Sequence, residues 1–445
     1  MYRRKIEQTL NLWKKKEGHK PLVIKGCRQC GKTSSVLDFA RKHYPNVICL
    51  DFHEHKEYKT LFAGALDVDT LTLAISAAIR GVKFVPGKTC IVFDEIQDCP
   101  NARASLKFFK LDGRFDVICT GSLLGVNGYK TKEELEEEEN ASIPVGFEQI
   151  VTMYPMDFEE WLWANGIEQQ HIDYLRHCLE CGTPVNEGIH QRMRELLLRY
   201  VVVGGMPEAV STFLETNNMN EVIDVQCGII ENYKADMLKY ARIEDKSRIR
   251  ECFESIPAQL AKENKKFQYA AIRKGGRSSQ YKGCLQWIED AGIIHRCYNT
   301  TITELPLSGN AVPDVFKVYM TDIGLLVSML DEGTAWSILQ GNLLAYKGAI
   351  FENLAADILC KMGRKLYYFQ KSGGLELDFL IRYKGECYPI ECKAQTGNAK
   401  SLKTVLSHPA HYHIHHALKV GDYNVGCRGP LLTLPFYMLF LLTEV

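Results

Sequence analysis

The chain has 445 residues, 46% of them hydrophobic and 24% charged, which is the composition of an ordinary globular protein with room for about two to four domains. Its 54 basic and 54 acidic side chains give a formal net charge of zero, which argues against a protein that coats nucleic acid or anionic membrane over its whole surface. The amino-terminal segment has no apolar stretch of the secretory type, and the longest apolar run, at 430–442, is too short and proline-interrupted to cross a bilayer. We therefore expect no membrane partner and, with sixteen scattered cysteines, a reduced cytoplasmic location.

The first part of the chain, residues 1–155, predicts a doubly wound α/β domain. Continuous apolar runs alternate with helical segments, and these runs lie at 21–25, 46–52, 88–95 and 115–122. Such runs are typical of parallel strands that are covered on both faces. The segments between them are long enough for crossover helices, so we predict a parallel sheet with helices on both sides.

The sequence GCRQCGKT at 26–33 fits the phosphate-binding pattern G-x-x-x-x-G-K-[ST], and it lies between a predicted strand and a predicted helix. Glycine lets the backbone wrap closely around phosphate oxygens, and the first N–H groups of a helix favour anions. We expect Lys32 to reach the β- and γ-phosphates of ATP and the Thr33 hydroxyl to ligate Mg²⁺. The predicted nucleotide-binding residues are Gly26, Cys27, Arg28, Gln29, Cys30, Gly31, Lys32, Thr33 and Ser34.

The third and fourth predicted strands of this domain, at 88–95 and 115–122, end in polar residues. The run CIVFDEIQ ends in Asp94 and Glu95. We expect Asp94 to hold Mg²⁺ through water, and Glu95 to orient and deprotonate the attacking water as a catalytic residue beside Lys32. The following strand ends at Thr120 and Ser122, which are candidate sensors of the γ-phosphate, although an ordinary strand-end turn explains them equally well.

Cys27 and Cys30 also fit the C-x-x-C pattern of zinc sites and redox pairs. A structural zinc site needs four ligands. The other such pair, Cys178 and Cys181, lies about 150 residues away in a segment with a helical pattern. We therefore favour the phosphate loop, with a regulatory disulfide as an alternative that nothing in the sequence demands.

The middle of the chain is mainly helical and holds a local basic segment. Between 262 and 282 there are seven Lys or Arg residues and one acid, interleaved with aromatic side chains. This composition favours contact with the phosphates of DNA, and the alternative is a solvent-exposed face of a domain that only packs against its neighbours. The residues predicted to bind nucleic acid are Lys265, Lys266, Arg273, Lys274 and Arg277.

Near the carboxyl end, GGLELDFLIRYKGECYPIECKA at 373–394 predicts a β-hairpin that turns at Lys384 and Gly385. A two-residue turn there places Asp378 opposite Glu391 and Lys393 opposite Glu376 on one face. The opposite, buried face is predicted to carry Leu375, Leu377, Phe379, Ile381, Tyr388, Ile390 and Cys392.

Two carboxylates that face each other across a hairpin destabilise it unless a cation lies between them. Mg²⁺ is the obvious candidate, and Glu352 on the preceding helix could complete a set with Asp378 and Glu391. With Lys393 beside them, this is the arrangement of a metal-assisted phosphodiesterase, in which Asp378, Glu391 and Lys393 are catalytic. The alternative is a solvated ion-pair face on an edge hairpin.

Taken together, the motifs resemble a known family. GCRQCGKT, FDEIQ, ICTGS, YVVVGGMPEAV, FKVYMTDIGLL, ELDFLI and PIECK look like segments of the prokaryotic AAA-type ATPases that carry a C-terminal domain of unknown function. The resemblance covers nearly the whole chain. It implies a P-loop ATPase domain over 1–155, a helical lid and winged-helix-like region over 156–305, and a domain similar to the PD-(D/E)XK nuclease fold over 306–445. It also implies a nucleotide site at Lys32, Thr33, Asp94 and Glu95, and a nuclease-like motif at Glu352, Asp378, Glu391 and Lys393.

One departure from this family concerns the arginine finger. Relatives often have a Gly-Arg where this chain has Gly146 followed by Phe147, so Arg103 and Arg114 are only guesses for that role. Whether a second copy of the chain supplies one, in a homo-oligomer, stays open. We expect a Mg²⁺-dependent ATPase whose nucleotide cycle controls a nuclease-like, DNA-interacting domain. The alternative is a nucleotide-driven switch or scaffold in which that domain is inactive and binds a partner.

Overall fold

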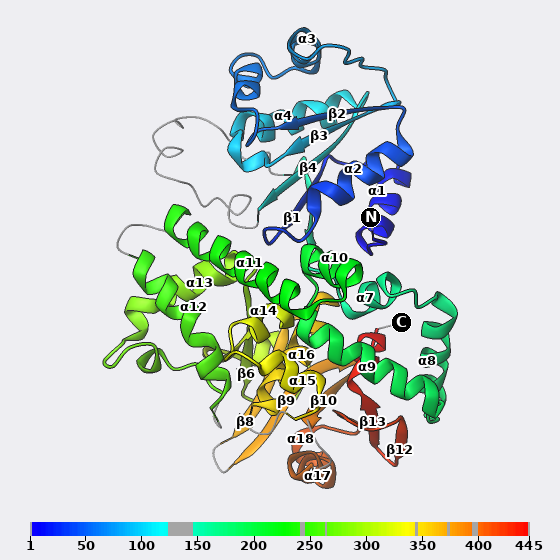
Figure 1. The fold of residues 1–445 in the computed structure, drawn as a ribbon, viewed down its shortest axis with the longest axis vertical. Helices are drawn as coiled ribbons and strands as arrows, with labels where there is room; N and C mark the ends of the chain where they lie inside the picture. The colour runs from blue at the N-terminus through cyan, green and yellow to red at the C-terminus, as the bar shows by residue number, and fades with distance from the viewer. Residues whose placement is uncertain are drawn as a thin grey trace.

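The structure is a computed structural model in which two sheets are joined by a helical region (Figure 1). It describes residues 2–122, 146–240, 245–262, 265–342, 346–371, 374–393 and 399–443. None of the described helices is both long and apolar enough to cross a membrane.

The amino-terminal sheet has five strands in the order β2-β3-β4-β1-β5, and every pairing is parallel. Its strands are β1 (Leu22–Gly26), β2 (Asn46–Asp51), β3 (Thr89–Asp94), β4 (Asp116–Ser122) and β5 (Gln149–Met153). Two hydrophobic clusters cover its faces, one with side chains of α1 (Ile6–Lys15) and α2 (Lys32–His43), the other with side chains of α3 (Val68–Ala78) and α4 (Pro100–Asp112). The predicted doubly wound domain is confirmed, and the carboxyl ends of β1, β3 and β4 meet at one edge.

The helical region lies between the two sheets (Figure 1). Its helices are α7 (Phe158–Ala164), α8 (Gln169–Cys181), α9 (Glu187–Val203), α10 (Pro207–Thr216), α11 (Met219–Tyr240), α12 (Lys246–Leu260) and α13 (Ser278–Asp290). A positive φ at Gly204 ends α9, and Pro207 begins α10. Gly205 approaches Met156 so closely that a Cβ atom would lie 1.9 Å from the Met156 carbonyl oxygen. This double-glycine segment therefore docks directly on the chain that leaves the first sheet.

The second sheet has eight strands in the order β12-β13-β11-β10-β9-β8-β6-β7. They are β6 (Ile294–Thr300), β7 (Ala311–Met320), β8 (Leu366–Lys371), β9 (Leu375–Tyr383), β10 (Glu386–Lys393), β11 (Ala417–Gly421), β12 (Gly426–Arg428) and β13 (Leu431–Pro435). The helices that follow β7 are α14 (Ile323–Ser328), α15 (Thr334–Leu339), α16 (Lys347–Lys361), α17 (Lys400–Ser407) and α18 (Pro409–Tyr412). Because β6 pairs with both β7 and β8, this sheet begins upstream of residue 306.

The β9–β10 hairpin has the predicted turn and register. Lys384 and Gly385 both have positive φ, 51° and 80°, as a tight two-residue hairpin turn requires, and Ile390 pairs with Phe379. The prediction that the apolar residues of β9 all lie on one buried face of the hairpin is wrong, however. Leu377 and Leu380 pack in a cluster with α17, whereas Phe379 and Ile381 pack in the cluster that contains α16.

A β-bulge in β9 explains this correction. Tyr367 pairs with Leu380 and Phe369 pairs with Leu377, so three steps along β9 match two steps along β8. The extra residue lies at Asp378–Phe379 and reverses the alternation of side chains beyond it. The sequence of β9 and β10 alone carries no sign of a bulge that is set by pairing with β8.

Candidate functional site

The loop between β1 and α2 is built around the Lys32 side chain. Its ammonium is almost fully buried and donates to the carbonyl oxygens of Gly26 and Cys27, at 3.3 and 2.9 Å. Gln29 and Gly31 have positive φ, 62° and 91°, which curls the loop back on itself. Helix α2 begins at Lys32 with no side-chain cap, so its first amide groups favour an anion.

Three residues from different elements meet at the edge of the sheet beside this loop. The Thr33 hydroxyl donates to Oδ1 of Asp94 at 2.8 Å, and the Thr120 hydroxyl donates to the same oxygen. Burial raises the pKa of Asp94, and these two hydroxyl groups partly oppose that shift. Ser122 is buried at the end of β4, where it pairs with Gly26 of β1. The structure thus brings Thr33, Asp94 and Thr120 into contact, and Ser122 lies at the end of the same strand as Thr120.

Glu95 follows Asp94 with a positive φ of 50°, an uncommon conformation for a residue other than glycine. Its carboxylate accepts a hydrogen bond from the Gln97 amide. Backbone outliers of this kind cluster at active sites, where surrounding structure holds them. Glu95 is therefore held next to the Thr33–Asp94 pair.

A hydroxyl and a carboxylate are hard oxygen donors of the type that Mg²⁺ takes, so Thr33 and Asp94 fit a magnesium ion that is also bound by phosphate and water. Among the described residues, no group of three or more His, Cys, Asp or Glu side chains is arranged to hold a metal. A Mg²⁺ site shared with a nucleotide does not need such a group.

A cavity of about 630 Å³ lies next to the loop. Its lining includes the predicted residues Gly31 and Ser34, and also Tyr2, Arg4 and Pro207, which the sequence did not assign to the site. Its volume lies in the range of small-molecule sites. Gly31 and Ser34 belong to the predicted phosphate loop and Pro207 to the segment YVVVGGMPEAV, whereas Tyr2 and Arg4 carried no signal.

The loop cysteines are packing residues of this site. Cys27 and Cys30 are buried, and the Cys30 thiol contacts the Met153 carbonyl oxygen at 3.6 Å. Cys178 and Cys181 lie on α8, and no described cysteine belongs to a metal-binding group. A hydrogen bond from Cys27 lowers the pKa of the Cys30 thiol to about 6. The regulatory disulfide remains an untested alternative.

Both guesses for an arginine finger are engaged within the chain. Arg103 forms an ion pair with Glu148 at 2.6 Å, and Arg114 pairs with Asp69 at 2.6 Å and with Asp112 at 2.7 Å. Each arginine therefore has a carboxylate partner within the same chain.

The second candidate site lies where α16 crosses the second sheet. Glu352 of α16 is buried and is held by the ammonium groups of Lys317, at 3.1 Å, and Lys265, together with the Tyr319 hydroxyl. Lys317 also contacts Glu376 at 2.6 Å. Burial alone would raise the pKa of Glu352, but the two lysines lower it to about 2. The ammonium groups of Lys317 and Lys265 thus lie around Glu352, which was predicted to be the third metal ligand.

The other predicted nuclease-like residues do lie together. Asp378 accepts a hydrogen bond from the Cys392 backbone N–H at 2.8 Å, and Lys393 contacts Glu391 Oε1 at 2.6 Å. Burial raises the pKa of Asp378 to about 7, and the charges of Glu352 and Glu391 contribute to that rise. Glu391 is 6% exposed, and its Oε2 atom has no hydrogen-bond partner among the described residues. With Glu352 already bonded to two lysines, these residues do not fit the predicted three-carboxylate metal site.

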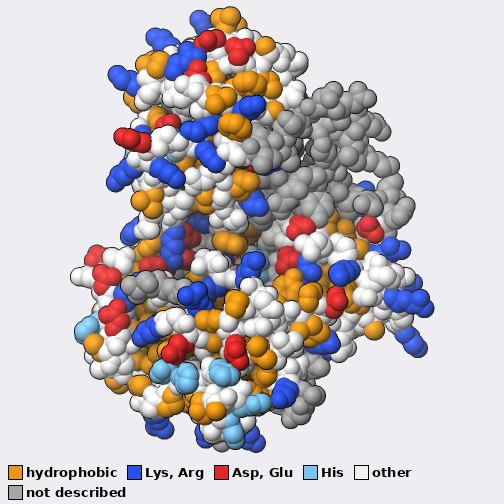
Figure 2. Space-filling view, turned by 180° about the vertical axis from the view of Figure 1, so that it is seen from behind, with side chains coloured by type: hydrophobic (Ala, Val, Ile, Leu, Met, Phe, Trp, Pro, Cys, Tyr) orange, Lys and Arg blue, Asp and Glu red, His pale blue; other side chains and the backbone are white. Residues whose placement is uncertain are grey.

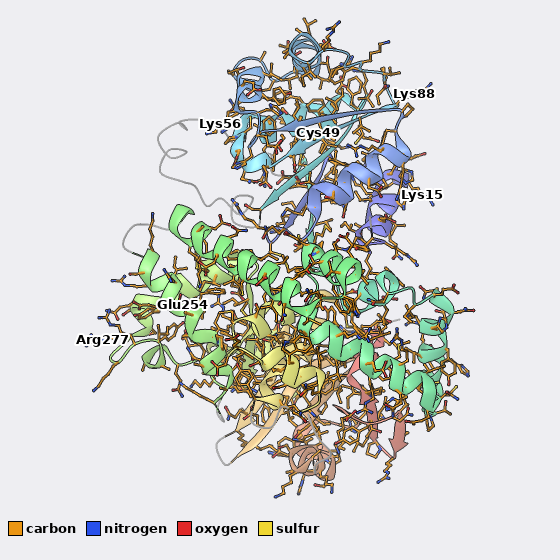
Figure 3. All side chains as sticks on the ribbon, viewed as in Figure 1. Lys15, Cys49, Lys56, Lys88, Glu254 and Arg277 are labelled. Atoms are coloured by element: carbon orange, nitrogen blue, oxygen red, sulfur yellow. The ribbon has the colours of Figure 1, made fainter. Side chains whose placement is uncertain are left out.

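The basic segment before and within α13 divides into two parts. Arg273, Lys274 and Arg277 are exposed, and Figure 3 shows Arg277 projecting from the edge of the molecule. Figure 2 shows blue basic side chains along this edge. The prediction for Lys265 is wrong, because its side chain turns inward to Glu352 and is only 17% exposed. Lys266 is half-buried and engaged within the chain.

The loop geometry agrees with a comparison to known families, in which residues 18–162 match the model described as an AAA domain. This match supports an AAA-type ATPase. Residues 194–335 and 347–428 match two domains of unknown function, DUF8612 and DUF4143. A search of curated proteins gave no match.

Several solved structures share features of the chain at low identity. The Walker-type ATPase PABY2304 of Pyrococcus abyssi is 15% identical with a TM-score of 0.42, over 74% of this chain and 96% of that one. The signal-transduction ATPase PH0952 of Pyrococcus horikoshii, which has a tetratricopeptide repeat sensor, is 11% identical with a TM-score of 0.27, over 80% and 48%. DnaA from Aquifex aeolicus, bound to AMPPCP, is 12% identical with a TM-score of 0.21, over 64% and 87%. Because all three TM-scores are below 0.5, the assignment to an AAA-type ATPase rests on the family model.

Proposed function

We propose that this chain binds Mg²⁺ and ATP at residues 26–34 and hydrolyses the nucleotide with the help of Asp94 and Glu95. The observation that carries the proposal is the convergence of Thr33 and Thr120 on one carboxylate oxygen of Asp94, beside the buried Lys32 ammonium. At this edge of the sheet the hydroxyl, carboxylate and ammonium groups would serve phosphoryl transfer by binding Mg²⁺ and the phosphates.

The loop residues supply binding and charge. The backbone N–H groups of the loop and of the first turn of α2 would bind the phosphate oxygens. Lys32 would exchange its two carbonyl partners for a phosphate, since an ammonium binds a charged oxygen more strongly than a neutral one. Thr33 and Asp94 would hold the magnesium ion, which neutralises charge on the transferred phosphoryl group when bound.

Glu95 would act as the base of the hydrolytic step. It accepts a proton from the attacking water as the water oxygen bonds to the γ-phosphorus and the bond to the β-phosphate oxygen breaks, giving ADP and inorganic phosphate. The cavity lined by Tyr2, Gly31 and Pro207 would receive the nucleoside. Thr120, bonded to Asp94, would sense the γ-phosphate through that carboxylate.

Two substitutions test the proposal. Lys32→Ala should lower ATP affinity by about 100-fold, and Glu95→Gln should bind ATP normally while lowering kcat by about 100-fold or more. Lys42→Ala is a matched control, because Lys42 is on the same helix and pairs with Asp38 on the surface. Turnover that is unchanged in both site variants would refute the proposed site.

For the carboxyl-terminal domain, we propose that it binds a partner and does not cleave it. The specific observation is that Lys317 and Lys265 neutralise Glu352, so the set of carboxylates predicted to hold a metal is incomplete. Cleavage of DNA remains the competing prediction. A plasmid-nicking assay with Mg²⁺ or Mn²⁺ decides between them: cleavage by the wild type that is lost in Lys393→Ala would overturn the binding proposal.

We also propose that the chain binds DNA, through the exposed basic side chains Arg273, Lys274 and Arg277 of the helical region. Replacing all three by Gln should weaken DNA binding and reduce the slope of log K against log salt by about 0.9 for each lost phosphate contact. Replacing Lys15, Lys56 and Lys88 by Gln removes the same charge from exposed positions on the ATPase domain (Figure 3) and serves as the control. Equal loss of binding in both triple variants would contradict a specific role for the first set.

A further inference from the structure

We infer that Arg4 is a positioning residue for the nucleotide site, because its buried guanidinium holds the Cys30–Gly31 peptide in the orientation that phosphate binding requires. This inference rests on the proposed ATP site. It adds to that site a residue from outside the phosphate-binding motif, 22 positions upstream of Gly26.

The Arg4 guanidinium makes two hydrogen bonds and one ion pair, each with a different part of the chain. Nη1 donates to the Cys30 carbonyl oxygen at 3.0 Å, and Nη2 donates to the Tyr154 carbonyl oxygen at 2.7 Å. Nε lies 3.0 Å from Oε2 of Glu160. Arg4 is 6% exposed. A planar guanidinium with three separate partners has a fixed orientation, and a lysine could not reproduce it.

The contact with Cys30 determines which way the next amide group faces. In a planar trans peptide the C=O and N–H bonds point in opposite directions. Arg4 lies against Gly31, where an added Cβ would come 3.3 Å from Nη1. Because the Cys30 carbonyl is held toward Arg4, the Gly31 N–H faces away from Arg4. Positive φ at Gln29 and Gly31 builds the anion-binding curve to which that N–H belongs.

Lys32 and Arg4 thus hold the loop from two sides. The Lys32 ammonium binds the carbonyls of Gly26 and Cys27, which a phosphate can replace as its partners. Arg4 instead donates to the backbone oxygens of Cys30 and Tyr154, and a phosphate, which seeks N–H donors, does not compete for these acceptors, so the two bonds can persist when a nucleotide binds. Arg4 therefore preorganises the loop, and Lys32 responds to the ligand.

Glu160 balances the charge of Arg4 and connects the loop to the helical region. Its carboxylate accepts hydrogen bonds from the backbone N–H groups of Lys5, at 2.5 Å, and of Asp157, at 3.1 Å. The second of these belongs to the capping box that begins α7. Arg4 consequently makes two kinds of contact that mutation can separate: carbonyl bonds to the loop and to Tyr154 just after β5, and an ion pair to α7.

The test compares Arg4→Gln, Arg4→Lys and Glu160→Gln in the full chain, by titration with a fluorescent ATP analogue and Mg²⁺. Arg4→Gln should raise Kd about tenfold, the effect of losing one charge-assisted contact, and Arg4→Lys should raise it by a similar factor. Glu160→Gln removes the same ion pair but leaves both carbonyl bonds, so Kd should change by less than about twofold. Equal weakening by Arg4→Gln and Glu160→Gln would show that Arg4 acts only through the ion pair, and would overturn the inference.

Hydrogen exchange of the peptide covering 26–34, measured without nucleotide, separates this inference from the proposed function. Arg4→Gln should speed exchange in this peptide, whereas Glu160→Gln and the surface control Lys42→Ala should not. Unchanged exchange in Arg4→Gln would refute the inference even if the wild type binds ATP. A wild type that fails to bind ATP would instead refute the proposed function. Thermal unfolding of each variant shows whether it folds. If Arg4→Gln does not fold, Arg4→Lys takes its place in both measurements.

Discussion

Two buried lysines, one in each half of the molecule, show how the same side chain can serve opposite purposes. Lys32 is bonded to two neutral carbonyl oxygens of the phosphate loop. Lys317 is bonded to the carboxylates of Glu352 and Glu376. Neutral partners leave the charge of Lys32 available to an incoming phosphate, whereas the charge of Lys317 is already neutralised inside the protein. The comparison teaches that burial of a cation does not mark a binding site; the charge of its partners does.

The largest expected effect is a difference in how much each of these two lysines contributes to the free energy of unfolding. Lys317→Met removes one of the two lysine partners of Glu352 and the ion pair of Glu376, so buried negative charge is left unbalanced, and we expect it to lower the free energy of unfolding by about 3–5 kcal/mol. Lys32→Met removes bonds to carbonyl groups only and should lower it by about 1 kcal/mol. Urea denaturation measures both. Adding Glu352→Gln to Lys317→Met should restore part of the loss, and equal losses for the two single variants would invalidate the comparison.

The next effect tests whether the charge of Lys32 is available to a ligand. ATP with Mg²⁺ at 100 times its Kd should stabilise the wild type by about 2.7 kcal/mol, and Lys32→Met should abolish most of this gain at the same concentrations. Mg²⁺ alone should leave the melting temperature unchanged, because the carboxylates near Lys317 do not form a metal site. A large shift with Mg²⁺ alone would mean that the carboxyl-terminal carboxylates bind the ion after all.

A smaller effect is expected at low pH, where Glu352 becomes protonated and its ion pairs with Lys317 and Lys265 no longer stabilise the fold. Its folded-state pKa of about 2 lies below the value of 4.5 for an unperturbed glutamate, so the unfolded chain binds more protons in between. The stabilisation is therefore complete above pH 4.5 and is lost as the pH falls toward 2. Wild type should lose on the order of 2 kcal/mol more than Glu352→Gln over this range. Parallel curves for the two proteins, from urea denaturation at each pH, would contradict the assignment.

The smallest expected effect concerns the turn that presents Asp378 and Glu391. Gly385 has a φ of 80°, so Gly385→Ala should cost about 1 kcal/mol. Lys384→Gly relieves the positive φ of 51° at its own position and should be nearly neutral or slightly stabilising. Thermal unfolding of both variants tests the turn without changing the contacts of Lys32 or Lys317.

The sequence by itself determined the features that depend only on residues close to one another along the chain. The spacing from Gly26 to Thr33 predicted the phosphate loop, because such a loop requires glycines and a lysine at fixed positions between a strand and a helix. The apolar runs predicted the parallel sheet, and Lys384-Gly385 predicted the hairpin turn and its register. Each of these signals is local, so no distant contact was needed to read it.

Tertiary structure alone decided the contacts between residues far apart in the chain. The bulge at Asp378–Phe379 is set by pairing with β8, and it overturned the predicted buried face. Lys265 and Lys317 reach Glu352 across 87 and 35 residues, which converts a predicted metal ligand into the acceptor of two ion pairs. Arg4 reaches the phosphate loop from a segment with no motif. Charge and hydrogen bonding act over a few ångströms in space, so a linear pattern identifies the groups that carry chemistry but not the partners that the fold brings to them.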